Sequence, residues 1–313
     1  MADAIPAAAP TPAPAPSKAR VFFRRLFSFV ILWTVVLTAL FSGNKILSDY
    51  VFLAVMLVLA GFGLLEFYNL VAACGLSCFK PWGILGGLLL MGGTFFHMQG
   101  FFGAASSPAS VNDFETGFLI LFVLGLCFRQ FLATDNSKAI SSIAITLLGL
   151  MYVAWLLNFI QKINFFPFAG STPAEAGTFY VLYFIVVTKF SDVGAYCVGS
   201  LFGKHKMIPR VSPNKTWEGF IGAVIVSTTA SLAFAAFAGA RLAGMNWLHA
   251  VALGVVLSTA AVVGDLIESI FKRQAGVKDS GRYFPGIGGV LDLLDSLLFN
   301  APLMYVYLRH VLT

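Results

Sequence analysis

Charged residues are scarce in this chain of 313 residues. Lys, Arg, Asp and Glu make up only 11% of it, whereas about 25% is usual in a soluble domain. Hydrophobic residues reach 58%, and several apolar runs approach the roughly 20 residues that a helix needs to span a bilayer. One large soluble core is therefore excluded, and we predict an all-α, polytopic integral membrane protein.

Cysteine and histidine are scarce too, with four residues of each. The cysteines mostly lie in or near apolar segments and lack the paired spacing of a zinc site, so we expect buried packing or free thiols. No Ser-His-Asp or Cys-His arrangement is evident, and the GxxxxGK[ST] pattern of a Walker loop is absent. The residues available for chemistry are therefore the carboxylates and the basic side chains.

Apolar runs predict about nine transmembrane helices. The candidate spans are 26–42, 49–69, 83–98, 117–133, 142–160, 177–191, 218–238, 247–264 and 293–311. If the N-terminus is cytosolic, alternation places only Lys45, Lys162, Arg241 and Arg309 of the basic residues on the far side. All other Lys and Arg residues then lie on the cytoplasmic side, which is the bias typical of membrane proteins.

Composition divides the chain into three parts. Residues 1–19 are rich in Ala and Pro and predict a disordered cytosolic tail. Residues 20–175 hold N-terminal transmembrane helices, and 176–313 form a C-terminal catalytic transmembrane region. We expect no cleaved signal peptide, because the first apolar run begins after Arg24 and Arg25 and no small-residue cleavage site follows.

Two predicted loops, 189–217 and 264–292, fall on the cytoplasmic side, where a soluble nucleotide would reach them. Asp192 in the first loop has two interpretations. It could join a cluster of metal-binding carboxylates, or it could pair with Lys189.

Carboxylates in and beside the second loop are paired at helical spacing. Asp265 with Glu268, and Asp292 with Asp295, are each i,i+3 pairs, so each pair shares a helix face. Two helix ends could bring them together, and clustered carboxylates repel unless a cation such as Mg²⁺ joins them. The alternative is a set of helix caps and surface ion pairs. Glu66 lies inside a predicted span, so it should have a basic partner in the site or a packing role.

Candidate phosphate-binding groups occur in both loops. Basic side chains can hold phosphates or meet lipid headgroups; those of the second loop are Lys272, Arg273, Lys278 and Arg282. A turn ending in Gly288 and Gly289 would let backbone N–H groups approach a phosphate before a helix start. In the first loop, Ser212, Lys215 and Thr216 precede a predicted helix and form either an anion site or helix caps.

The second loop resembles the signature of CDP-diacylglycerol synthases, also called phosphatidate cytidylyltransferases. That signature, S-x-x-K-R-x4-K-D-x-G-x3-P-x-H-G-G-x-x-D-R-x-D, is similar to the stretch from Ser269 to Asp295. The segments FSDVGAY from Phe190 and SPNKTWEG from Ser212 also resemble the family. Ile287 stands where the family has His, and Leu293 where it has Arg. All the carboxylates remain, which favours an active, divergent member.

The resemblance implies that CTP and phosphatidate react to give CDP-diacylglycerol and pyrophosphate, in a bacterial cytoplasmic membrane. It implies Mg²⁺, with a second cation also compatible, and the metal ligands Asp265 and Asp292 supported by Glu268 and Asp295. The implied catalytic residues are Asp265, Asp292, Lys278 and Asp279. The implied substrate-binding and phosphate-binding residues are Ser212, Pro213, Lys215, Thr216, Ser269, Lys272, Arg273, Gly288 and Gly289.

The expected partners are the two substrates and membrane lipids, without nucleic acid. Gly83 and Gly87 have a small-xxx-small spacing that permits helix packing within one chain or between two, so a homodimer is an open alternative. Other functions that we weighed are a CTP-dependent polyprenol or phytol kinase, a transporter and an inactive scaffold. The signature argues against the kinase, and the charges gather at one face rather than along a path through the spans, which argues against the transporter.

Overall fold

The computed structural model describes residues 43–101, 108–168, 175–281 and 288–312, together with 30, 33–38 and 40–41. The predicted tail at 1–19 and much of the predicted span 26–42 lie outside these residues. So do Arg282 and Ile287 of the second predicted loop.

Helices make up most of the described chain. In order, its elements are α2 (Lys45–Ala73), α3 (Lys80–Met98), α4 (Pro108–Phe131), α5 (Ala139–Gly149), the π-helical η1 (Leu150–Trp155), α6 (Leu156–Asn164), α7 (Ala176–Phe202), β1 (Lys206–Ile208), β2 (Ser212–Thr216), α8 (Trp217–Ala238), the short 3₁₀ turn η2 (Gly239–Arg241), α9 (Trp247–Gln274), α10 (Val290–Tyr307) and the π-helical η3 (Leu308–Leu312).

Seven of the described helices, with α5 to α6 counted as one and η2 and η3 included with α8 and α10, are long and apolar enough to cross a membrane. The prediction of an all-α polytopic membrane protein is therefore confirmed. The count of nine is not: the predicted span 83–98 forms α3, but this glycine-rich helix is not among the seven.

Two of the helices are longer than the apolar runs that predicted them. The predicted span 177–191 becomes α7, which continues through Asp192 to Phe202, and the predicted span 247–264 becomes α9, which continues to Gln274. Asp192 and Asp265 therefore lie on helices and not in loops. Apolar length shows where a chain crosses the hydrocarbon, but a helix continues until its backbone is capped.

A small antiparallel hairpin, β1 paired with β2, connects α7 to α8. The sequence does not reveal this hairpin, because strands of three and five residues are too short to show an alternating pattern. The Trp217 N–H at the start of α8 donates to the His205 carbonyl (2.9 Å), which closes the base of the hairpin.

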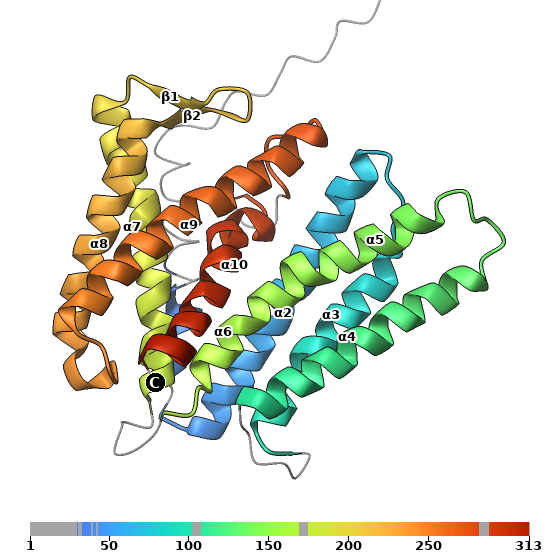
Figure 1. Cartoon of the computed structure of the whole chain (residues 1–313), viewed down its shortest axis with the longest axis horizontal. Helices are drawn as coiled ribbons and strands as arrows, with labels where there is room; N and C mark the ends of the chain where they lie inside the picture. The colour runs from blue at the N-terminus through green and yellow to red at the C-terminus, as the bar shows by residue number, and fades with distance from the viewer. Residues whose placement is uncertain are drawn as a thin grey trace, which may run out of the picture.

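The helices form two groups on either side of α10. Figure 1 shows α7, α8 and α9, drawn yellow to orange, on one side of α10, and α2 to α6 on the other. α10 packs against α9, α6, α2 and α7. The start of α10 therefore meets α9 and α2 at once.

The small-residue spacing at Gly83 and Gly87 serves packing within the chain. A Cβ atom at Gly83 would overlap the Tyr68 ring, and one at Gly87 would overlap Leu64. Both partners belong to α2 and are fully buried. These glycines let α3 approach α2 closely, and a homodimer stays a prediction.

A buried ion pair joins α4 to α6. Lys162 Nζ lies 2.5 Å from Glu115 Oε2, and Asn158 donates to Glu115 Oε1 (2.7 Å). Both charged side chains are buried, so each needs the other to offset the loss of water. The start of α4 and the end of α6 lie at the end of the bundle opposite the β1–β2 hairpin (Figure 1). This pair is therefore a packing feature remote from the hairpin.

Candidate active site

A polar cavity of about 690 Å³ opens between α7, the β1–β2 hairpin, α8, α9 and the first turns of α10. It brings together residues from both predicted loops. The predicted site residues that line it are Ser212, Lys215, Thr216, Asp265, Lys272, Asp279, Asp292 and Asp295. The two segments are distant in sequence, and the packing of α7, α8, α9 and α10 joins them into one site.

Three carboxylates gather where α9 meets α10. Asp265, Glu268 and Asp295 each offer an oxygen, and these oxygens lie within 4.8 Å of one another. Glu268 is fully buried, and its Oε1 has no hydrogen-bond partner within the described residues. Carboxylates this close, two of them buried, repel one another unless a cation or a proton joins them. The donor set therefore fits a hard divalent cation, which prefers oxygen ligands.

The carboxylate of Asp292, the fourth predicted metal ligand, accepts hydrogen bonds from three groups. Its Oδ2 accepts from the N–H groups of Gly289 (2.8 Å) and Ser280 (3.1 Å), and its Oδ1 accepts from Lys272 Nζ (2.7 Å). The bond from Gly289 is a capping interaction at the start of α10. Asp292 lines the cavity but is not in the three-carboxylate group, so its role as a metal ligand stays a prediction.

Two lysines form ion pairs with this acidic cluster. Lys215 on β2 forms an ion pair with Asp265. Lys272 on α9 pairs with both Glu268 and Asp292. Both lysines also line the cavity, so an anion that enters it would find cationic groups beside the carboxylates.

The end of the hairpin forms a helix start that faces the cavity. Thr216 is the N-cap of α8, and its hydroxyl accepts from the Gly219 N–H (3.1 Å). Ser212 and Asn214 also line the cavity, whereas Pro213 is exposed and lies outside its lining. The predicted cap at Thr216 is confirmed. The free N–H groups of a helix start are also suited to anions, so the two interpretations are compatible.

Several predicted substrate-binding residues, and the predicted catalytic residue Lys278, do not line the cavity. Arg273 donates instead to the carbonyls of Val211 (3.1 Å) and Val277 (3.4 Å), which ties the hairpin to the end of α9. Ser269 is buried, and Lys278 is exposed outside the lining. Gly288 and Gly289 lie in the turn before α10 and act through the backbone; Gly288 has a φ of 116°.

Asp192 lies between two cavities. It lines the polar cavity, and its Oδ2 is 3.6 Å from Lys189 Nζ, so the predicted pairing with Lys189 is present. It is not part of the three-carboxylate group. Asp192 and Lys189 also form one end of an apolar groove of about 570 Å³ that runs between α2, α7, α10 and the described part of 33–40.

Leu293, at the position where the related signature has Arg, lies in this apolar groove. Its carbonyl accepts from Lys189 Nζ (3.1 Å). Lys189 of α7 therefore places a cation beside the backbone of the residue that replaces the Arg.

Glu66 was expected either to pair with a basic residue or to serve packing, and its hydrogen-bond partners are instead uncharged polar groups. Its carboxylate accepts from the N–H groups of Val290 (3.0 Å) and Leu291 (2.7 Å), and from the hydroxyl of Ser280 (3.0 Å). The expectation that this carboxylate in a predicted span has a partner is confirmed. The partners themselves are not predictable from the sequence, because they are groups more than 200 positions away and two of them are backbone N–H groups.

Other residues that line the polar cavity were missed by the sequence analysis as site residues. They include Tyr196 and Ser200 on α7, and Ser296 on α10, whose hydroxyl donates to Asp295 Oδ1 (2.8 Å). The signal that could have found Tyr196 and Ser200 is their helical spacing from Asp192, at i+4 and i+8 on one face of α7.

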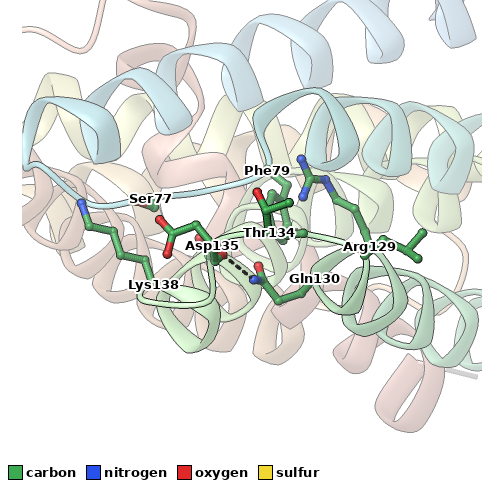
Figure 2. Close-up of a pocket in the computed structure, with 10 residues that line it drawn as sticks. Ser77, Phe79, Arg129, Gln130, Thr134, Asp135 and Lys138 are labelled. Atoms are coloured by element: carbon green, nitrogen blue, oxygen red, sulfur yellow. Dashed lines mark hydrogen bonds between the residues drawn. The ribbon is translucent and has the colours of Figure 1, made fainter.

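A further cavity of about 640 Å³ lies between the α2–α3 and α4–α5 connections (Figure 2). The Arg129 guanidinium stacks 3.8 Å above the Phe79 ring, and Gln130 donates to the Asp135 carbonyl (3.1 Å). The Ser137 N–H donates to Asp135 Oδ1 and holds the pKa of that carboxyl below its usual value. None of the predicted metal-binding or phosphate-binding residues lines this cavity.

Comparison with known proteins agrees with the resemblance found in the sequence. A model of the cytidylyltransferase family matches residues 23–311. The phosphatidate cytidylyltransferase of Staphylococcus saprophyticus is 37% identical over 207 residues, which cover 64% of this chain and 72% of that protein. The protein of that name in Mycobacterium leprae is 47% identical over 134 residues, 42% of this chain and 41% of that protein. YnbB of Escherichia coli is 34% identical over 209 residues, 64% of this chain and 65% of that protein.

Proposed function

Since the chain belongs to the cytidylyltransferase family, we propose that it transfers a cytidylyl group from CTP to phosphatidate. The products are CDP-diacylglycerol and pyrophosphate, and the enzyme works in phospholipid biosynthesis. The observation that supports this most directly is the polar cavity, which combines a carboxylate cluster with Lys215 and Lys272 and adjoins an apolar groove at Asp192. A charged nucleotide and a lipid can both approach that point.

The reaction needs positioning more than proton transfer. A phosphate oxygen of phosphatidate attacks the α-phosphorus of CTP, the new P–O bond forms, and the bond to the β-phosphate breaks as pyrophosphate leaves. The phosphate monoester is already ionised near neutral pH, so no side chain has to act as a base. The main barrier is charge, because two anions must meet and the leaving group gains charge.

Asp265, Glu268 and Asp295 would hold Mg²⁺, with Asp292 supporting the cluster. The fit rests on the spacing of the three carboxylate oxygens and on the unpartnered, buried Glu268 Oε1. Bound there, the cation would neutralise charge on the phosphates and on the departing pyrophosphate. A second cation is compatible with the remaining carboxylates, Asp192 and Asp279, which also line the cavity.

The cationic groups of the cavity bind and orient the phosphates in this proposal. Lys215 and Lys272 are paired with carboxylates. With a cation held by the carboxylates, these ammonium groups would be available to phosphate oxygens, as point charges without a fixed fork geometry. Thr216 and the start of α8 add backbone N–H groups on the same wall.

The lipid would use the apolar groove. One acyl chain lies in the groove while the phosphate reaches Lys189 and the polar cavity at Asp192. This places the reacting phosphate at the membrane boundary. We place the site on the cytoplasmic side of a bacterial cytoplasmic membrane, with the N-terminus in the cytosol, because that orientation follows the distribution of Lys and Arg.

The first test is the dependence of pyrophosphate release on each component. Purified protein in detergent should release pyrophosphate only when CTP, phosphatidate and Mg²⁺ are all present, and chelation by EDTA should stop it. Omitting each component in turn is the control. Formation of CDP from CTP and a polyprenol, without any release from phosphatidate, would instead identify a lipid-alcohol kinase.

A second test narrows the groove. Val193 lines it and is 51% exposed, so Val193→Trp should fold while its indole blocks the space. We expect the KM for long-chain phosphatidate to rise about tenfold, in the range usual for shape changes in apolar pockets, with the KM for CTP unchanged. A short-chain phosphatidate should recover most of the loss.

Val306→Trp is the matched control for the groove. Val306 is 50% exposed on α10 and does not line the groove. If both tryptophan variants change the KM for phosphatidate equally, the acyl chain does not use this groove.

A further inference from the structure

Glu66 caps a helix to which it does not belong. It lies on α2 and is only 1% exposed, yet its two carboxylate oxygens accept from Val290 N–H (3.0 Å) and Leu291 N–H (2.7 Å) at the start of α10. The first N–H groups of any helix lack partners within that helix. Here a carboxylate from the N-terminal half of the chain supplies partners for two of them.

Ser280 connects Glu66 to the candidate active site. Its hydroxyl donates to Glu66 Oε2 (3.0 Å), and its N–H donates to Asp292 Oδ2 (3.1 Å). Asp292 Oδ1 accepts from Lys272 (2.7 Å), which also pairs with Glu268. Hydrogen bonds and an ion pair therefore connect α2 continuously to the carboxylate cluster.

Two glycines of the signature are explained by the same carboxylate. A Cβ atom at Gly281 would overlap Glu66 Oε1, and its three nearest atoms all belong to the Glu66 side chain. A Cβ atom at Gly289 would overlap Ser280 Oγ and lie 2.5 Å from Glu66 Oε2. Gly281 does not have a positive φ, so the need for glycine there is the close approach of Glu66 and not the backbone conformation.

We propose that Glu66 is a positioning residue: from α2 it fixes the start of α10 and, through Ser280, holds the Asp292 carboxylate against Lys272. This role in turnover rests on the proposed function. Glutamine at this position would keep the shape but replace one accepting oxygen with an NH₂ group that cannot accept. A buried N–H group or the Ser280 hydroxyl would then lose its partner.

The first experiment measures the capping directly, without any substrate. Hydrogen exchange followed by mass spectrometry should show the amides of 288–292 exchanging about tenfold faster in Glu66→Gln than in the unsubstituted protein, because local opening becomes easier. Peptides from α8 should be unchanged. Unchanged exchange at 288–292 would overturn the proposal, whatever lipid the enzyme uses.

The second experiment is kinetic. We expect Glu66→Gln to lower kcat/KM for CTP about 100-fold, the scale of a misplacement of about 1 Å in a catalytic group. The KM for CTP should rise and kcat should fall, since Asp292 and Lys272 both line the cavity. A fall in the amount of folded protein alone would lower kcat and leave the KM unchanged, and this result would show a merely structural role.

A double-mutant cycle tests the contact itself. Gly281→Ala should lower kcat/KM about tenfold or more, because its methyl group displaces the Glu66 carboxylate. In the Glu66→Ala background the same substitution should cost less than about twofold, since residues in contact have non-additive effects. Additive losses would show that Gly281 does not act through Glu66 and would overturn the proposed contact between them.

Glu115→Gln is the matched control. Glu115 is also a buried carboxylate in an apolar helix, but its partners Lys162, Asn158 and Trp155 lie outside the polar cavity. It should lower thermal stability and leave the KM for CTP and the exchange at 288–292 unchanged. If Glu115→Gln reproduces the Glu66→Gln kinetics and exchange, the effect is general loosening of the bundle and not positioning.

Discussion

Asp265→Asn should lower turnover by about 10²- to 10³-fold, the usual effect of removing one electrostatic contact to the transition state. Asp265 joins Glu268 and Asp295 within 4.8 Å and also pairs with Lys215. The amide keeps the shape of the side chain but removes its charge. Both cation binding and the orientation of Lys215 should therefore suffer, and kcat should fall together with the apparent affinity for Mg²⁺.

The measurement is pyrophosphate release at several Mg²⁺ concentrations. Asp49→Asn is the control, because Asp49 is a carboxylate of α2 that accepts from Gln99 (3.0 Å) and is not part of the polar cavity. If Asp265→Asn turned over normally with the same Mg²⁺ requirement, the carboxylate cluster would not be the cation site that we propose.

Lys272→Met should abolish turnover and lower the thermal stability of the protein. Lys272 is the partner of the fully buried Glu268 and of Asp292, whose side chain is 14% exposed. Breaking a buried ion pair on one side leaves an uncompensated charge and typically costs about 3–5 kcal/mol. A clear fall in Tm in detergent is therefore expected, with turnover below detection. Lys138→Met removes an exposed lysine at the start of α5 and should change neither quantity.

A second substitution separates stability from chemistry at this position. In Lys272→Met/Glu268→Gln the buried charge of Glu268 is also removed, so much of the lost Tm should return. Turnover should stay low, because the cationic group that orients phosphate and one carboxylate of the cluster are both missing. Recovery of turnover with Tm would show that Lys272 matters only for folding.

Much of the architecture could be read from the sequence. A helix in a bilayer must satisfy its own backbone hydrogen bonds, so each span depends on a local run of apolar residues. Seven such helices are present in the described chain. The hairpin and the extensions of α7 and α9 were not predictable in this way, because polar residues that face a cavity interrupt the apolar pattern without ending the helix.

Some of the predicted site residues line the polar cavity, and others do not. Asp265, Lys272 and Asp295 line the cavity together, as the i,i+3 carboxylate pairs and the signature indicated. Arg273 was predicted to hold phosphate and instead holds the Val211 carbonyl of the hairpin. Residue type and spacing identify groups able to bind an anion, but a guanidinium serves a backbone carbonyl equally well, and only its surroundings distinguish the two roles.

By itself, the sequence determined that this protein is an all-α membrane protein, and it predicted on which side the positive charge gathers and which short segments carry the chemistry. These properties depend on residues close together in the chain. Only the tertiary structure decided that Glu66 caps α10, that Asp292 is held by Lys272 and Ser280, and that the polar cavity meets an apolar groove at Asp192. Each of these depends on helices distant in sequence coming into contact, and hydrogen bonds to backbone groups leave no signature in the identity of the residues that provide them.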